Sequence, residues 1–376
     1  MSSALKLLRE LIALPSVNPA FLAGAPDLTG EKRVADFLAF NADREGLEIE
    51  FQEVFPGRSN LLVRLTPPGG KALRSILLAP HLDTVGGTPG QFIPALKNGR
   101  LSGRGACDTK GSVAAMFSAL LAVASSGLRP KETEIVFAGL VDEENGQTGS
   151  RKLAASGFKA DLAIVGEPTR LDVITAHKGD LWLRLETRGR SAHGSVPHLG
   201  RNAVHTAARV VELLETTYAT QLKRRRHPLL GHGTVNVGAI RGGVQANIVP
   251  DECSAIIDRR TLPGETESSV CRELAALFRS HKLAVKIHDT KGAPCDPLET
   301  DPDHPLVRQF LRSAGKRCTK GVAFFCDAAP LAAAGTPAIV FGPGDLAQAH
   351  TADEWIAVES LDRGTAVLTR FLRSLP

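Results

Sequence analysis

The sequence predicts an α/β fold with a largely parallel, buried sheet, together with an inserted α+β domain. Two observations support this prediction. Apolar, strand-like runs alternate with helix-like segments through the first half of the chain, which is typical of a parallel sheet covered by helices. Residues 179–290 have a different pattern, in which apolar and polar side chains alternate as in half-exposed strands.

The main fold begins with an amphipathic helix, because leucine and isoleucine recur at helical spacing within residues 5–12. Residues 111–125 are rich in alanine, leucine and valine and stop before Gly127, which predicts a helix packed on a sheet. The runs predicted as buried strands are 60–65, 75–79, 134–141, 161–165 and 337–341. Ligands of open α/β sheets gather at the carboxyl ends of such strands, so polar residues just beyond them are candidates for a site.

The inserted region has the order strand, helix, strand, strand, helix, strand, which is that of a ferredoxin-like sandwich. Its six segments are 180–188, 202–217, 233–240, 252–258, 265–281 and 283–287. Candidate ligands lie on both sides of it in the sequence. We therefore expect a discontinuous catalytic domain, residues 1–178 and 291–376, with residues 179–290 inserted into it.

Composition limits the class of function. The chain has 376 residues and a formal net charge of +5, so its charge gives no argument for a nucleic-acid partner. The basic run 223–227 has no aromatic neighbours and is interpreted as a solvated loop. No segment reaches the roughly 18–20 apolar residues of a membrane span, and Lys6, Arg9 and Glu10 interrupt any signal peptide. Six cysteines without a Cys-x-x-Cys pair are typical of reduced thiols, so we expect a cytoplasmic protein with no membrane partner.

Several potential metal ligands follow apolar runs or glycine-rich bends. They are His81, Asp108, Glu144, Glu167 and His350. Each one alone has an ordinary explanation, since a histidine after a strand is often a core residue and paired acids often form a solvated turn. Together they predict a site for two divalent ions bridged by a carboxylate, and therefore a hydrolase that activates water.

Six short motifs of the chain carry a resemblance to a known family. They are His81-Leu-Asp83, Gly105-Ala-Cys-Asp108-Thr-Lys-Gly111, Asp142-Glu143-Glu144, Gly166-Glu167-Pro168, Ser191-Ala-His193-Gly and Gln348-Ala-His350. In this order they resemble the dinuclear zinc deacylases and exopeptidases, which include acetylornithine deacetylase, succinyl-diaminopimelate desuccinylase, aminoacylase and glutamate carboxypeptidase. The resemblance covers nearly the whole chain. It implies a zinc-binding α/β catalytic domain with an inserted lid or dimerisation domain, and a homodimer.

The resemblance assigns His81 and Glu167 to one metal site, and Glu144 and His350 to the other. Asp108 is expected to bridge the two ions, because one carboxylate can offer an oxygen to each. Imidazole and carboxylate ligands suit zinc, although cobalt and manganese also fit.

Two acidic residues beside these ligands are expected to act without binding metal. Asp83 is expected to accept the second ring N–H of His81 and so fix its tautomer, the alternative being an ordinary turn aspartate. Adjacent Glu143 and Glu144 leave the backbone in different directions, so one can bind metal while the other faces the water. Glu143 is therefore the expected general base, which later donates the proton to the leaving amine.

Three residues of the inserted region resemble substrate-binding positions. In relatives, the histidine equivalent to His193 reaches the active site of a partner subunit and stabilises the oxyanion at the scissile carbonyl. Some members of the family are instead thought to be monomers whose lid closes over its own site. Asn247 resembles the residue that holds the substrate carbonyl. Arg260 resembles the one whose planar fork holds the substrate carboxylate, with Arg259 as the alternative.

Two features narrow the substrate. Glu167, together with residues 341–345 and 348–354, looks most like acetylornithine deacetylase and its near relatives. Residues 324–326 depart from that pattern, because Phe, Phe and Cys stand where relatives often carry Gly, Ser or Thr. This segment helps to shape the substrate pocket in the family, so the resemblance does not name one substrate.

The expected reaction is removal of the acyl group from an N-acyl amino acid that bears a free carboxylate. A carboxypeptidase or dipeptidase acting on a short peptide is the alternative within the class. The alternative from another class is a non-catalytic small-molecule binding protein on the same fold. Cys107 and Cys326 are not expected as nucleophiles, because the histidines that a thiol would need are assigned to metal or oxyanion.

Overall fold

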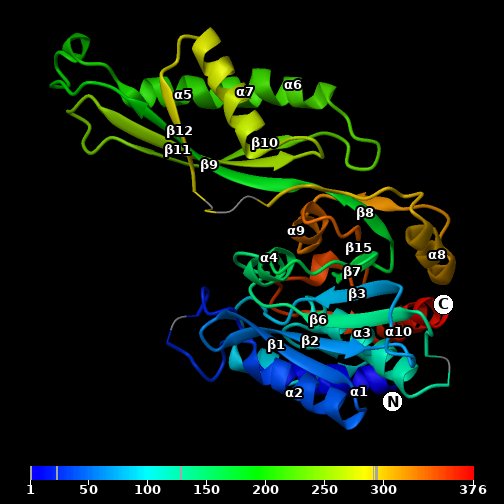
Figure 1. Ribbon diagram of the computed structural model, residues 1–376. Coiled ribbons are helices and arrows are strands. Elements are labelled where there is room, and N and C mark those ends of the chain that lie inside the picture. The colour runs from blue at the N-terminus through cyan, green and yellow to red at the C-terminus, as the bar shows by residue number, and fades with distance from the viewer. Residues whose placement is uncertain (1, 23, 128, 291, 293–294) are drawn as a thin grey trace. The chain divides into compact units, whose positions relative to one another are not determined.

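In a computed structural model the chain forms two compact units, and residues 2–22, 24–127, 129–290, 292 and 295–376 are described (Figure 1). Unit 1 comprises Met1–Thr175, Thr300–Lys320 and Cys326–Pro376, and unit 2 comprises Ala176–Glu299 and Gly321–Phe325. Unit 2 thus extends a few residues beyond the expected insertion on each side and includes one further short segment.

Unit 1 is built on a mixed sheet. Its strands, in spatial order, are β1 (Glu48–Phe55), β2 (Arg58–Leu65), β6 (Thr133–Gly139), β3 (Arg74–Pro80), β7 (Leu162–Gly166), β15 (Ala338–Val340) and β8 (Ile174–His177). The strands β13 (Leu298–Glu299) and β14 (Lys320–Val322) pair with β8. The expected parallel arrangement holds for β6, β3, β7 and β15, whereas β1, β2 and β8 pair with their neighbours antiparallel.

Helices cover both faces of this sheet. The helix α3 (Lys110–Ala124) packs on the sheet between α1 (Ser3–Ile12) and α10 (Val358–Arg373). The remaining helices of unit 1 are α2 (Lys32–Arg44), α4 (Thr148–Ala155), α8 (Pro305–Ala314) and α9 (Ala328–Ala333). Ile76 and Leu78 of β3 belong to the core formed with α3, and Leu77 between them is equally buried on the other face. Burial on both faces explains why the central strands are continuous apolar runs.

Short elements complete unit 1. They are the strands β4 (Ala95–Lys97), β5 (Arg100–Ser102) and β16 (Trp355–Ala357), and the 3-10 helices η1 (Pro89–Phe92) and η4 (Leu346–Gln348). The strands form a separate three-stranded sheet in the order β16-β5-β4.

Unit 2 has the ferredoxin-like arrangement expected from the sequence. Its elements are β9 (Gly179–Arg188), α5 (Ala203–Leu213), α6 (Ala219–Arg224), β10 (Thr234–Gly242), β11 (Glu252–Thr261), α7 (Glu267–Ser280) and β12 (Val285–Asp289). A 3-10 helix, Pro197–Leu199, precedes α5, and a π-helical turn, Leu214–Tyr218, joins α5 to α6. The sheet is antiparallel in the order β10-β11-β9-β12, and one of its faces packs on the helices. Alternating burial along β11 is the structural counterpart of the alternation seen in the sequence.

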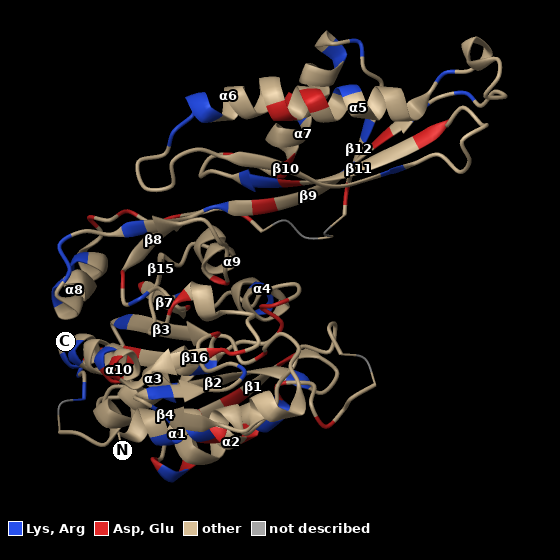
Figure 2. Ribbon diagram, turned by 180° about the vertical axis from the view of Figure 1, so that it is seen from behind, with Lys and Arg blue, Asp and Glu red and all other residues tan. Residues whose placement is uncertain are grey.

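The basic run 223–227 is partly helical, which differs from the loop expected. Lys223 and Arg224 end α6, as the basic residues at that end of the helix show in Figure 2. Arg225 pairs with Glu265 and Glu273, at 3.3 and 2.6 Å. Within the described ranges, no helix combines the length and the apolar character that crossing a membrane requires.

Candidate metal centre

The candidate ligands of unit 1 lie beyond the carboxyl ends of its parallel strands. His81 follows β3, Glu167 follows β7, and Glu144 lies five residues after the end of β6. His350 belongs to the loop after β15 and has a left-handed backbone, with φ of 61°. Because these strands are neighbours in the sheet, residues far apart in the sequence meet at one edge.

Asp108 lies at the centre of the cluster, in the loop before α3. Its Oδ1 is 3.2 Å from Nε2 of His81, and its Oδ2 is 3.3 Å from Nε2 of His350. Glu167 Oε1 is 3.8 Å from Nε2 of His81, and Glu144 Oε2 is 3.1 Å from Nε2 of His350. Asp108 therefore connects two groups, each with one histidine and one glutamate.

Two sets of three potential ligand atoms lie within 4.8 Å of one another among the described residues: His81 with Asp108 and Glu144, and His81 with Glu143 and Glu167. The second set includes Glu143, which the sequence assigned to proton transfer and not to metal. The carboxylate of Glu143 therefore lies close enough to His81 and Glu167 to bind a metal ion as well as to accept a proton. Variants of Glu143 and Glu144 can distinguish these two roles.

The electrostatics of the cluster fit a bound cation. Burial raises the pKa of Glu167 well above its usual range, and Asp108 adds to this against the opposing effect of His81. Burial also raises the pKa of Glu143, and neighbouring Glu167 adds to it. Hydrogen bonds with Asp108 and Glu144 raise the pKa of His350 to about 10. The ionised forms of Glu143 and Glu167 are therefore disfavoured by burial, and His350 is held by its hydrogen bonds with Asp108 and Glu144.

Glu167 gives a second test of the fit to a metal. Its Oε1 is buried and accepts no hydrogen bond from any residue that the structure describes. Leaving a buried acceptor without a donor is costly, and a divalent cation satisfies such an oxygen directly. The mixture of imidazole nitrogen and carboxylate oxygen suits zinc and related ions.

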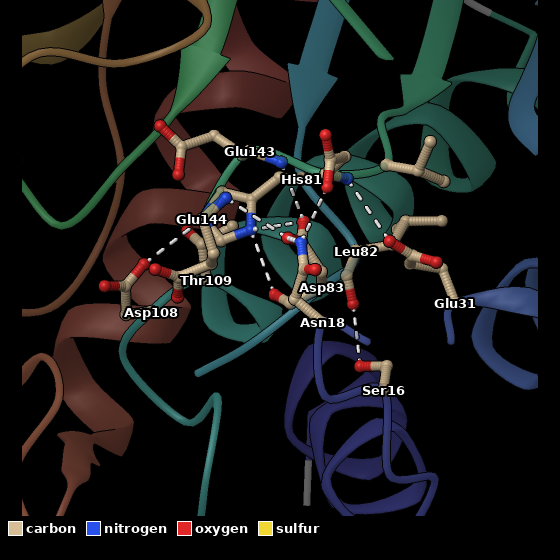
Figure 3. A network of polar contacts seen from close by, with 12 residues as sticks. Ser16, Asn18, Glu31, His81, Leu82, Asp83, Asp108, Thr109, Glu143 and Glu144 are labelled. Carbon is tan, nitrogen blue, oxygen red and sulfur yellow. Dashed lines mark hydrogen bonds and ion pairs between the residues drawn. The ribbon is translucent and has the colours of Figure 1, made fainter. Parts of the chain in front are cut away.

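Asp83 contacts both His81 and the two adjacent glutamates. The Nδ1 atom of His81 is 3.0 Å from the backbone carbonyl oxygen of Asp83 and 3.5 Å from its carboxylate. The carboxylate instead accepts hydrogen bonds from the backbone N–H groups of Glu143 and Glu144, both at 3.1 Å (Figure 3). Asp83 therefore orients His81 mainly through its carbonyl and holds the two glutamates through its side chain.

The two candidate cysteines are poor nucleophiles. Burial raises the pKa of the Cys107 thiol, and nearby Asp108 adds to this. Cys326 is fully buried, and burial together with Glu167 raises its pKa well above the usual value. Because the thiolate is the reactive form, both side chains are suited to packing and not to covalent catalysis.

In unit 2 the structure brings His193 and Asn247 together. The backbone N–H of Gly194 donates to the carbonyl of Asn247 at 2.7 Å, and His193 forms an antiparallel bridge with Ile248. The Nδ1 atom of His193 contacts Ser195 Oγ at 2.7 Å, and the side chain is exposed. Both candidate residues thus present polar groups at one surface of unit 2.

Arg259 and Arg260 point to opposite sides of β11. Arg259 is fully buried and donates to Tyr218 Oη at 3.1 Å and to Glu265 at 2.7 Å. Arg260 is partly exposed and forms two hydrogen bonds of 2.9 Å with Asp258. Both arginines therefore have acidic partners inside unit 2, and they differ in exposure, because only Arg260 reaches the surface.

Glu354, the last residue of the segment 348–354, supports the site although its motif predicted no role for it. Its carboxylate is buried and accepts from the backbone N–H groups of Gly105, Cys107 and Asp108, at 3.0, 2.8 and 2.9 Å. It also accepts from Arg104 Nη1 at 2.7 Å. Four donors therefore fix the loop that carries Asp108. The signal available in the sequence was an acid four residues after His350.

Comparison with known proteins places the chain in a family. The model of "Peptidase family M20/M25/M40" matches residues 77–374. The chain belongs to this family. It is 32% identical to an acetylornithine deacetylase of Myxococcus xanthus, with 98% of each chain covered, and 31% identical to one of Proteus mirabilis, with 94% and 91% covered.

Solved structures of the family share the fold. An aminopeptidase of Bacillus cereus has a TM-score of 0.81 at 20% identity, covering 99% of this chain and 97% of its own. A metallo-carboxypeptidase of Sulfolobus solfataricus has a TM-score of 0.76 at 19% identity, with 99% of each chain covered. The expected α/β fold with its antiparallel insert is confirmed. This M20 protein is a dinuclear metallohydrolase of the deacylase and peptidase type, and its histidine and carboxylate cluster implies divalent metal ions.

The role of Glu354 can be tested by replacing it with glutamine. Glu354→Gln keeps the size of the side chain but removes its charge and turns one acceptor oxygen into a donor, which faces backbone N–H groups. We expect the affinity of the metal-free protein for Zn²⁺ to fall about 10–100-fold, as for other supports of metal ligands, measured by titration calorimetry. Glu359→Gln, an exposed glutamate of α10, is the matched control. An unchanged Zn²⁺ affinity in Glu354→Gln would contradict the assignment.

Proposed function

We propose that the protein hydrolyses the amide bond of an N-acyl amino acid with a free carboxylate, in the manner of acetylornithine deacetylase. The observation that carries the proposal is Asp108 placed between two histidine and glutamate groups, in a chain matched over nearly its full length by relatives of that name. The residues that would hold two divalent ions are His81, Asp108, Glu144, Glu167 and His350. We propose zinc as the metal, with cobalt or manganese able to replace it.

The side chains divide the chemistry among them. Bound divalent ions would polarise the scissile carbonyl and lower the pKa of the attacking water. Glu143 accepts the proton of that water and donates it to the nitrogen of the leaving amine. Asp83 holds the backbone of Glu143 and Glu144 in place while this proton moves. His193 and Asn247 donate hydrogen bonds to the carbonyl oxygen as negative charge develops on it.

A substrate screen tests the proposal. The metal-loaded protein is assayed with N-acetyl, N-succinyl and N-formyl amino acids and, in parallel, with dipeptides, while metal content is measured. Turnover of N-acyl amino acids at least tenfold above that of dipeptides supports a deacylase. The reverse ratio would establish the dipeptidase or carboxypeptidase alternative, which the solved relatives of the same fold keep open. The six cysteines, none of them in a Cys-x-x-Cys pair, agree with the cytoplasmic location that we also propose.

Glu143 and Glu144 can be separated by their effects on metal. Glu143→Ala should lower turnover by at least about 100-fold, the lower end of what a general base contributes, while metal content stays that of the parent. Glu144→Ala should instead lower metal occupancy, measured by elemental analysis after dialysis. Loss of metal from the Glu143 variant, with metal kept by the Glu144 variant, would reverse the two assignments.

Arg260 is proposed to bind the substrate carboxylate. Losing one partner of a charged hydrogen bond typically costs about 2–5 kcal/mol, so Arg260→Ala should reduce kcat/KM on free-acid substrates at least about 30-fold. The same variant should act on the corresponding carboxamides nearly as well as the parent does. Arg188→Ala, which removes another arginine from unit 2, serves as the control. An equal loss on acids and carboxamides would move the carboxylate contact elsewhere.

We further propose a homodimer in which His193 completes the site of the partner subunit. A closed twofold dimer makes this exchange reciprocal, so it has two composite sites. Mixing inactive His193→Ala protein with inactive Glu143→Ala protein should then restore part of the activity, because one composite site of each mixed dimer is intact. If labelled subunits exchange and no activity returns, the proposed role of His193 in the partner's site is wrong.

A further inference from the structure

Asn18, near the amino terminus, contacts two acids that adjoin the proposed base Glu143 and the proposed metal ligand Glu144. Asn18 belongs to a segment that runs along the residues after β3. Ser16 Oγ donates to the carbonyl of Leu82 at 2.7 Å, and the Asn18 N–H donates to the carbonyl of Thr84 at 2.9 Å. The Thr84 N–H donates in return to the carbonyl of Ser16 at 3.0 Å. These bonds fix the backbone of Asn18 without using its side chain.

The side-chain amide of Asn18 is fully buried and uses all of its polar groups. Its Nδ2 donates to Asp83 Oδ2 at 2.8 Å and to Asp142 Oδ1 at 3.0 Å. Its Oδ1 accepts from the N–H of Ala20 at 3.0 Å. Carboxylates only accept hydrogen bonds, so the two N–H groups of the amide match the two acids and fix its orientation.

Both acids control the turn that carries Glu143 and Glu144. Asp83 accepts the backbone N–H groups of this pair, one on each carboxylate oxygen (Figure 3). Asp142 immediately precedes the pair. Its backbone is left-handed, with φ of 67°, a conformation that residues other than glycine rarely adopt. Asn18 therefore connects the acid that anchors the turn to the strained residue at which the turn begins.

The charges around Asn18 explain why a neutral donor is needed there. Asp83, Asp142 and Glu31 are all buried, and Arg58 supplies the nearby positive charge. Arg58 forms two hydrogen bonds with Glu31, at 2.6 and 2.8 Å, but lies 3.4 Å from Asp142. The Asn18 amide places two N–H dipoles between Asp83 and Asp142 without adding charge. A carboxylate of the same shape would add a further negative charge between two acids.

We propose that Asn18 is a positioning residue of the active site, whose amide sets the direction of Glu143 and Glu144 through Asp83 and Asp142. The role rests on the proposed function, in which Glu143 moves the proton and Glu144 binds metal. Asn18 lies outside residues 77–374, the part matched by the family model. The network therefore ties the amino-terminal segment to a centre whose proposed base and metal ligands all lie in the matched region.

The test uses the isosteric variant Asn18→Asp. We expect the Zn²⁺ affinity of the metal-free protein, measured by titration calorimetry, to fall about 10–100-fold, the range found for residues that support metal ligands. In the metal-loaded enzyme, kcat should fall by a similar factor while KM changes less than threefold, because Asn18 does not touch substrate. Thr300→Val is the control, since it removes buried hydrogen bonds to Ala338 in unit 1 away from the acids.

A second change distinguishes positioning from a general loss of stability. In Asn18→Asp with Asp142→Asn, an amide again faces a carboxylate across the same contact, and asparagine tolerates the left-handed backbone at 142. The contact with Asp83 is not restored, so we expect this double variant to recover part, and not all, of the lost Zn²⁺ affinity. Asn18→Ala removes the two donors without adding charge, so its loss of Zn²⁺ affinity and kcat should be smaller than that of Asn18→Asp. This variant replaces Asn18→Asp if the latter does not fold.

The outcomes separate this inference from the proposed function. The positioning role is overturned if folded Asn18→Asp keeps the Zn²⁺ affinity and kcat of the parent. If Asn18→Asp does not fold, the same result in Asn18→Ala overturns it. A loss in Asn18→Asp that the double variant does not recover would overturn the specific contact with Asp142. A parent protein that binds Zn²⁺ but cleaves no N-acyl amino acid would refute the proposed function alone, because the Zn²⁺ titrations still decide the role of Asn18.

Discussion

The accumulation of acidic groups at the carboxyl edge of one sheet is the constraint on which this active site depends. The ligand atoms of Asp108 and Glu144 lie within 4.8 Å of each other, as do those of Glu143 and Glu167, and Asp108 and Glu167 are almost completely buried. Like charges removed from water repel strongly unless cations or donors accompany them. His81 and His350 supply part of the compensation, and the arrangement is complete only with positive charge between the acids.

A surrounding set of acids holds the loops that carry the cluster. Asp83 accepts the N–H groups of one loop, and Glu354 accepts those of another. Loops beyond strand ends have no ladder in which to pair their backbone donors, so buried carboxylates take that place. One charged side chain can accept several N–H groups at once, which makes each loop rigid without a regular element. The acidic side chains of the site therefore include both the candidate ligands and base and the groups that hold its loops in place.

The clustering of the candidate ligands could be predicted from the sequence, because each stands beside a recognisable strand or motif and strand ends in a parallel sheet converge. The sequence did not predict Asn18, Glu31 or Arg58, because their segments carry no motif and meet the site only through the tertiary fold. The flanks of the sheet were missed for a related reason. The strand β1 has exposed or half-exposed side chains throughout, so its pattern lacks a buried run. The direction of neighbouring Arg259 and Arg260 depends on which face of β11 is covered, and local pattern alone left both open.

The candidate ligands of the metal centre span most of the chain, from His81 to His350, with unit 2 encoded between them. Contacts of such large sequence separation close only after most of the chain has collapsed, which slows folding. During synthesis, the segment with His350 and Glu354 emerges after every other candidate ligand, so a nascent chain that ends before it cannot hold the complete cluster. Metal capture is therefore coupled to the emergence of this segment and to the finished fold. A chain truncated before residue 350 would lack the centre even with every earlier ligand in place.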